Sequence, residues 1–108
     1  MDPSSAIVVL ITAGSHEEAA RIANSLVETR LAACVQILPQ IESVYWWKGR
    51  IERSPEVLLL AKTTPDKFSE IETTVRSLHS YDTPEIIAIP VTEVSAPYLE
   101  WLSGTLGS

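Results

Sequence analysis

The segment from residue 79 to 85 carries the side chains of this chain that are best suited to chemistry. His79, Tyr81 and Glu85 supply an imidazole, a phenol and a carboxylate within one short loop. Lys62 ends an apolar stretch that we expect to lie beside this loop. Such groups, gathered at one place, can bind a small ligand or a divalent metal ion. We therefore predict a small-ligand or metal pocket between subunits that is formed by Lys62, His79, Tyr81 and Glu85, with His79 as the metal ligand.

The same four residues also allow a purely structural interpretation. Lys62 and Glu85 can form an ion pair between strands or between subunits, and Tyr81 can simply pack. His79 can close the C-terminal end of a helix, where the helix dipole favours a cation. The sequence leaves the binding and the structural interpretations open.

Catalysis and a conventional metal motif have less support. No pair of His or Cys residues has a metal-ligand spacing such as Cys-x-x-Cys, and the other histidine, His16, falls in the first turn of an expected helix. Cys34 lies in an apolar setting, so we expect it to be a small buried hydrophobe. We predict that the protein is not an enzyme; a hydrolase or transferase that uses His79 with Glu85 or Lys62 is the third of our hypotheses.

The composition limits the classes of partner and compartment. The 108 residues carry 14 acidic and 8 basic side chains, a net charge of −6, which argues against nucleic acid and anionic membranes as partners. No apolar run is long enough to span a membrane, and the N-terminus does not resemble a signal peptide. A single cysteine fits a reducing compartment. We expect a cytoplasmic protein of one domain, 1–108, with residues 1–5 as a disordered extension.

Hydrophobic periodicity and turn signals predict the order of the elements. Ser15 and Glu18 have the spacing of a helix capping box, Thr64 and Pro65 open a second helix, and Gly49 supplies a hairpin turn. We expect four strands over residues 6–12, 33–47, 51–63 and 85–94, and helices over 15–30, 64–78 and from 95 onward. This order is the split βαβ, or ferredoxin-like, plan of an α+β protein, with a four-stranded antiparallel sheet and a long hairpin between its second and third strands. Pro39 and Pro90 fall in the second and fourth strands, which this plan places at the edges, where proline is tolerated.

Three consecutive aromatic residues, Tyr45, Trp46 and Trp47, stand just before the hairpin turn. Successive side chains of a strand point to opposite faces, so these aromatics need cover on both faces of the sheet. The two main helices can cover only one face, and a large uncovered apolar face normally meets a partner surface. We therefore predict a symmetric homo-oligomer.

The chain resembles the CutA divalent-cation tolerance family from about Ile7 to Leu102. The resemblance rests on five pieces in order: Leu31-Ala32-Ala33-Cys34, Tyr45 with Trp47 and Gly49, Lys62-Thr63, the run from His79 to Ile86, and Tyr98 with Trp101. It implies an unusually stable, thermostable homotrimer of ferredoxin-like subunits, similar to the P-II-type nitrogen-regulatory proteins, with no established enzymatic activity. We assign Cys34, Tyr45, Trp47, Tyr98 and Trp101 to the trimer interface or the core.

The resemblance also implies a link to copper and other divalent cations. The copper ligands proposed in the family are a first-strand cysteine and two adjacent histidines; this chain has Ile11 and Leu78 at two of these places and keeps His79. Copper needs several nitrogen or sulfur ligands, so one imidazole makes no specific site. Cu²⁺ or another divalent cation is the cofactor we consider, and we expect folding to require none.

Two hypotheses stand ahead of the enzymatic one. The first is a homotrimer that acts in divalent-cation tolerance or signalling and binds a small ligand or a cation in the clefts between subunits. The alternative is a stable structural or adaptor module, or a P-II-like signalling trimer, that displays its hairpin tips and C-terminal tail to a protein partner whose identity the sequence does not give.

Overall fold

A computed structural model describes residues 6–107, so the extension predicted for residues 1–5 lies outside the described residues. Four strands and three α-helices follow one another as β1 (Ile7–Ala13), α1 (His16–Glu28), β2 (Cys34–Trp47), β3 (Arg50–Thr63), the 3₁₀ turn η2 (Pro65–Lys67), α2 (Phe68–Leu78), β4 (Ile86–Pro90) and α3 (Ala96–Leu106). This order confirms the predicted ferredoxin-like α+β fold. No helix among residues 6–107 is long and apolar enough to cross a membrane.

The four strands form one antiparallel sheet in the order β2-β3-β1-β4. As predicted, the central strands are the two apolar ones, β1 and β3, and Pro39 and Pro90 lie on the edge strands. Pro55 lies in β3, but before Val57, where β3 pairs with β2 alone. Pro39 lies where the β2–β3 register shifts between Leu38 and Ile41, and Pro90 is the last residue of β4. The two edge prolines therefore sit where a ladder hydrogen bond is already missing or at a strand end.

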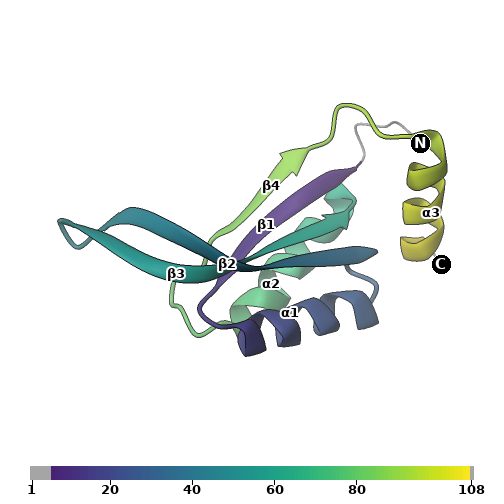
Figure 1. Ribbon diagram of the computed structural model, residues 1–108. Coiled ribbons are helices and arrows are strands. Elements are labelled where there is room, and N and C mark those ends of the chain that lie inside the picture. The colour runs from purple at the N-terminus through teal and green to yellow at the C-terminus, as the bar shows by residue number, and fades with distance from the viewer. Residues whose placement is uncertain (1–5, 108) are drawn as a thin grey trace.

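Helices α1 and α2 pack side by side against one face of the sheet (Figure 1). The core between them consists of fully buried apolar side chains, among them Ile11 and Leu59 from the sheet and Ile22, Leu26 and Ile71 from the helices. Neither α1 nor α2 covers the opposite face, which we call the open face. α3 stands beyond one end of the sheet, far from the tip of the β2–β3 hairpin.

The hairpin extends well past the rest of the sheet (Figure 1). β1 pairs only with Val57–Thr63 of β3, so the first half of β3 pairs with β2 alone. Trp47 pairs with Arg50 across a two-residue turn in which Lys48 and Gly49 have φ of 52° and 77°. Positive φ at both central residues is the requirement of the tight hairpin turn whose twist matches that of the strands.

Three boundaries differ from the sequence prediction. The second helical segment begins after Thr64 as predicted, but as a 3₁₀ turn, and Thr64 makes no side-chain cap bond. β4 ends at Pro90 instead of residue 94, because it has passed the start of its partner β1; the last bond on this edge runs from the Val91 N–H to the Ala6 carbonyl. Helix α1 ends at Glu28, so Arg30 lies outside its last turn, with φ of 59°, and donates to the Thr105 carbonyl of α3.

Candidate functional site

The predicted site residues divide between two ends of the sheet. Lys62 pairs with Val8 of β1, and Val8 pairs with Ile89 near the end of β4. The loop that contains His79, Tyr81 and Glu85 lies at the other end, where β4 begins. Lys62 lies six positions along β3 from Glu56, which Tyr81 contacts, a span of about 20 Å. The predicted contact between Lys62 and this loop is therefore wrong within one chain.

His79 is held by backbone atoms on both sides of its ring. Its Nε2 lies 2.6 Å from the Thr12 carbonyl oxygen, and its Nδ1 accepts a hydrogen bond of 3.1 Å from the Tyr81 N–H. This network assigns a neutral ring with the proton on Nε2. The side chain is fully buried. His79 thus links the loop to the end of β1. The structural interpretation had assigned it only to the C-terminal end of a helix.

Glu18 is the buried carboxylate of this end. Its Oε2 accepts a hydrogen bond of 2.6 Å from the Ser80 N–H, and its Oε1 accepts bonds of 3.2 Å from the Ser80 hydroxyl and from the Gly14 N–H. Glu18 Oε2 also lies 3.7 Å from Nδ1 of His79. We call Gly14, Glu18, His79 and Ser80 the Glu18 cluster. It joins the start of α1 to the loop between α2 and β4.

The hydrogen bonds of Glu18 determine its ionisation. Burial acts to raise the pKa of this carboxyl group, but the two backbone N–H donors and the Ser80 hydroxyl act in the other direction and leave the pKa below its ordinary value. The cluster therefore holds a carboxylate whose bonds are all made within the chain, which is the condition for a buried charge to be tolerated.

Tyr81 and Glu85 lie at the surface of the same end. The Tyr81 hydroxyl donates to Oε2 of Glu56 over 2.9 Å, and its ring stacks at a tilt against His79 with centroids 4.6 Å apart. Burial and the Glu56 carboxylate raise the pKa of Tyr81 to about 12. Glu85 is exposed, and no lysine, arginine or histidine of residues 6–107 lies within ion-pair distance of it, so the Lys62–Glu85 ion pair does not form within one chain.

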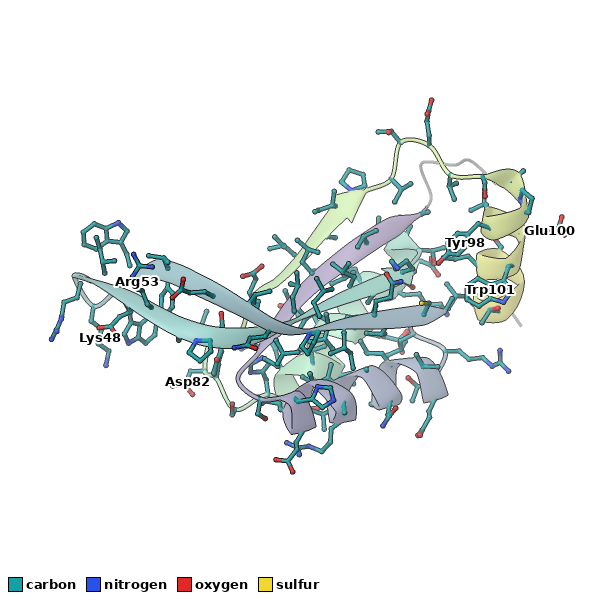
Figure 2. The ribbon with its side chains drawn as sticks, viewed as in Figure 1. Lys48, Arg53, Asp82, Tyr98, Glu100 and Trp101 are labelled. Carbon is teal, nitrogen blue, oxygen red and sulfur yellow. The ribbon has the colours of Figure 1, made fainter. Side chains whose placement is uncertain are left out.

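At the opposite end, Lys62 lies on the open face beside the N-terminal part of α3. Its ammonium donates a hydrogen bond to Oε1 of Gln36 on the neighbouring strand. Both residues line a hollow of about 360 Å³ together with Val8, Tyr98, Leu99 and Leu102. We call it the Lys62 hollow. In Figure 2, Tyr98 and Trp101 lie on the side of α3 that faces the sheet, and Glu100 points away.

The residues assigned to the trimer interface or core are not part of the core of a single chain. Tyr45, Trp47, Tyr98 and Trp101 are all exposed, and Cys34 is half-buried on the open face, opposite Lys62. Their place in an assembly stays a prediction. For Tyr98, burial and the neighbouring Cys34 raise the pKa of the hydroxyl.

The arrangement limits the chemistry of one chain. In the part of the chain that the structure describes, no three His, Cys, Asp or Glu side chains come together in a way that could hold a metal ion. Both ring nitrogens of His79 are engaged by backbone atoms, so His79 as a metal ligand stays a prediction that this conformation does not favour. The same bonds leave His79 no free nitrogen to act as a base.

Three residues that organise these two ends were not among the predicted site residues: Glu18, Glu56 and Gln36. Glu18 was predicted only as part of a capping box, and Ser15 does cap the helix, with its Oγ 3.2 Å from the Glu18 N–H. The Glu18 carboxylate, however, reaches Gly14 and Ser80 instead of returning to Ser15. Its place four residues before the fully buried Ile22 put it on the buried face of α1, and this spacing could have revealed it.

Comparisons with known proteins agree with this fold over nearly the whole chain. The family model described as CutA1 divalent ion tolerance protein matches residues 7–105. The divalent-cation tolerance protein CutA of Thermus thermophilus is 48% identical over 100 residues, which cover 93% of this chain and 97% of that protein. The human protein CutA is 43% identical over 100 residues, but the chain spans only 56% of its length.

Solved structures give the same result. The periplasmic divalent cation tolerance protein CutA of Archaeoglobus fulgidus superposes with a TM-score of 0.91 at 44% identity, over 94% of this chain and 98% of that one. CutA1 of the psychrotrophic bacterium Shewanella sp. SIB1, which is described as a stable protein, superposes with a TM-score of 0.92 at 37% identity over the full length of both chains. The fold, the order of its elements and these identities together show that the chain belongs to the CutA1 divalent ion tolerance family.

Proposed function

We propose that this protein acts in divalent-cation tolerance as a homotrimer, and that it works by assembly and binding instead of by catalytic turnover. The observation that carries the proposal is the large apolar surface that a single chain leaves uncovered on the open face and on the hairpin. The family names of its relatives supply the link to divalent cations.

The open face is apolar across its central strands. Leu10 pairs with Leu60 on one side and with Ile87 on the other, so the three side chains form a row on the same face. Ile87 and Ile89 at the edge of this row are 49% and 47% exposed. A continuous apolar face of this kind is rare on a monomer and is typical of an interface between chains.

The hairpin adds apolar side chains on both of its faces. Trp46 is 71% exposed and Trp47, the next residue, is 53% exposed on the opposite face. Ile51, which pairs with Trp46, is 62% exposed. A hairpin that projects from its own sheet can pack both of its faces against neighbouring copies of the chain. Within residues 6–107, no helix or second sheet packs against its projecting part. That the assembly contains three chains is an inference from the family resemblance.

A metal would have to act outside the contacts that one chain provides. The candidate ligand His79 is engaged within the chain, and Lys62 lies at the far end of the sheet. A cation site would therefore combine residues of different chains, or the effect on cation tolerance would be indirect. Catalysis has little support for the same reason: the three groups named for it, His79, Glu85 and Lys62, do not meet within one chain.

Assembly and cation tolerance are tested separately. Light scattering on dilute protein should return three times the 11.9 kDa mass of the chain, and the mass of one chain would overturn the trimer. Trp47→Ala should move the protein toward monomer or aggregate, because a large buried group typically contributes about 3–5 kcal/mol. An unchanged elution volume and melting point would place Trp47 outside the interface.

The role in cation tolerance is tested in cells and by titration. A strain that lacks the gene should grow less well than its parent in elevated Cu²⁺ or another divalent cation, and the chain should restore growth. Calorimetric titration of the protein with copper and zinc shows whether it binds these cations directly or affects cation tolerance without binding them. Equal growth of both strains with every cation would overturn the role. Cytoplasmic localisation is part of the proposal, and fractionation of the same cells tests it, since one solved relative is named periplasmic.

A further inference from the structure

Lys62 carries a positive charge that no acidic group of the described chain balances. The residue is half-buried, and the only partner of its ammonium among residues 6–107 is the amide oxygen of Gln36. No carboxylate of those residues lies within ion-pair distance of it, although the whole chain carries 14 acidic side chains. An ammonium that has no carboxylate partner within its own chain is available to pair with an anionic group of a ligand.

The space beside this ammonium is apolar. Val8 of β1 lies directly opposite Lys62 in the sheet, and Val91 and Val94 follow the end of β4. Leu99 and Leu102 of α3 line the opposite side of the hollow. Its volume of about 360 Å³ falls in the range of roughly 300–1,000 Å³ that is common for small-molecule sites.

We propose that the Lys62 hollow binds a small organic monocarboxylate whose hydrocarbon part is apolar. The carboxylate pairs with the ammonium of Lys62, and the hydrocarbon part packs against the valine and leucine side chains. Gln36 presents its amide oxygen to Lys62, which leaves its NH₂ group free to donate to the second carboxylate oxygen. Tyr98, on the sheet-facing side of α3, offers a hydroxyl donor at the rim (Figure 2).

The charge and the lining together select this class of ligand. A metal ion is repelled by the ammonium, and an uncharged apolar molecule leaves the ammonium unpaired. Phosphate is recognised by several cations or by a cluster of backbone donors, and the hollow has one lysine. The Tyr98 hydroxyl, whose pKa is raised by burial and by Cys34, stays protonated at neutral pH and acts as a donor.

α3 is held in place independently of this ligand. Leu102 and Leu106 pack with Ala33, and the Arg30 guanidinium donates to the Thr105 carbonyl over 2.8 Å. The hollow therefore exists before a ligand enters, which lowers the free-energy cost of binding. The inference deepens the proposed function by naming a ligand class. It rests on the proposed function in that the protein acts by binding and in that the trimer, which uses the open face, leaves the end of that face beside α3 accessible to solvent. All of the lining comes from one chain.

The test uses hexanoate and benzoate as probes, with hexanamide, benzamide and inorganic phosphate as comparisons. Methyl NMR spectra of the full chain should show shifts of the Val8, Leu99 and Leu102 signals with the two carboxylates, with a dissociation constant of about 1 mM or below for ligands of so few atoms. The amides and phosphate should bind at least about tenfold more weakly, because they lack either the charge or the matching shape.

Variants locate the site. Lys62→Met keeps the length of the side chain and removes the charge, and it should weaken carboxylate binding about tenfold or more; Lys62→Arg keeps the charge and should retain most of the binding. Lys67→Met removes a lysine on η2, outside the hollow, and should bind as the parent does. Melting curves show that each variant is folded.

Three results would overturn the inference: no methyl shifts with either carboxylate, equal binding of carboxylates and amides, or full binding by Lys62→Met. Light scattering on the same samples separates this outcome from the proposed assembly. A trimer that binds no carboxylate rejects the ligand class and keeps the trimer. A monomer that still binds through Lys62 rejects the trimer and keeps the hollow.

Discussion

At the end of the sheet where β1 finishes, the carboxylate of Glu18 accepts three hydrogen bonds, whereas at the other end the ammonium of Lys62 has one amide partner and no carboxylate. Both groups are removed from bulk water to some degree, and each belongs to a residue that is usually exposed. The Glu18 cluster uses its charge to join two segments of the chain. The Lys62 hollow leaves its charge unbalanced beside open apolar space.

This difference separates a structural role from a binding role. A buried polar group whose partners are all supplied by its own chain stabilises the fold, and its loss leaves those partners unpaired. A charged group without such partners contributes little to the fold and is available to a ligand. Within one chain, the four predicted ligand-binding residues therefore do not form one site: His79 belongs to the Glu18 cluster, and Lys62 belongs to the hollow.

Glu18→Ala should give the largest loss of stability. It leaves the N–H groups of Gly14 and Ser80 without an acceptor, and hydrogen bonds to a charged group contribute about 1.5–3 kcal/mol each. We expect a loss of about 3 kcal/mol or more in the free energy of unfolding, measured in urea at fixed protein concentration. Glu17→Ala is the matched control, because Glu17 stands in the same first helical turn but is exposed. Equal effects of the two changes would contradict the structural role of the cluster.

Low pH should lower the free energy of unfolding through the same cluster, but by less than Glu18→Ala does. The pKa of Glu18 is lowered in the folded chain, so its contribution is present above the ordinary value of 4.5 and is lost as the pH falls through the lowered value. The effect is smaller than that of Glu18→Ala, because a protonated carboxyl group still offers an oxygen as acceptor. Urea unfolding of the parent and of Glu18→Gln should show a stability difference that narrows below pH 4.5. A difference that stays constant across this range would contradict the lowered pKa.

Much of the fold could be predicted from the sequence, because it depends on local patterns. The unbroken apolar runs of β1 and β3 and the two edge prolines were enough to place the four strands. The position of Lys62 was misjudged, although the predicted topology already implied it. In an antiparallel sheet the end of β3 lies beside the start of β1, and therefore away from the loop that leads into β4.

The polar contacts of the candidate site were harder to predict, since they join residues far apart in the sequence. Ser80 meets Glu18 across 62 positions, and no spacing rule connects them. Gln36 and Lys62 are adjacent only through the register of β2 against β3, and a shift of one residue would place them on opposite faces of the sheet. Helical spacing could show that Glu18 is buried, but not which loop it holds.

Lys62→Met should have an effect of opposite sign to that of Glu18→Ala. It replaces the cationic side chain of a half-buried residue by a neutral one of similar length, and the exposed Gln36 amide that loses its partner can still reach water. We expect stability to be unchanged or to rise by up to about 1 kcal/mol, as is common when a binding residue is replaced. Thermal and urea unfolding without ligand measure it. A loss above about 1 kcal/mol would mean that the Lys62–Gln36 pair is structural and that the two ends do not differ in kind.

Tyr81→Phe should have the smallest effect, because Tyr81 lies at the rim of the well-bonded end. The change removes the hydrogen bond to Glu56, a carboxylate that water can reach, and should cost about 0.5–1 kcal/mol. It should also remove the tyrosine that titrates at about 12, which the ultraviolet absorbance of the phenolate reports. Tyr45→Phe is the control, since its hydroxyl bonds to the uncharged Ser54 over 3.1 Å. If Tyr81→Phe destabilised the chain as much as Glu18→Ala, the surface residues of this end would also be structural. The loop from His79 to Glu85 would then have no residue left that is available to bind a ligand.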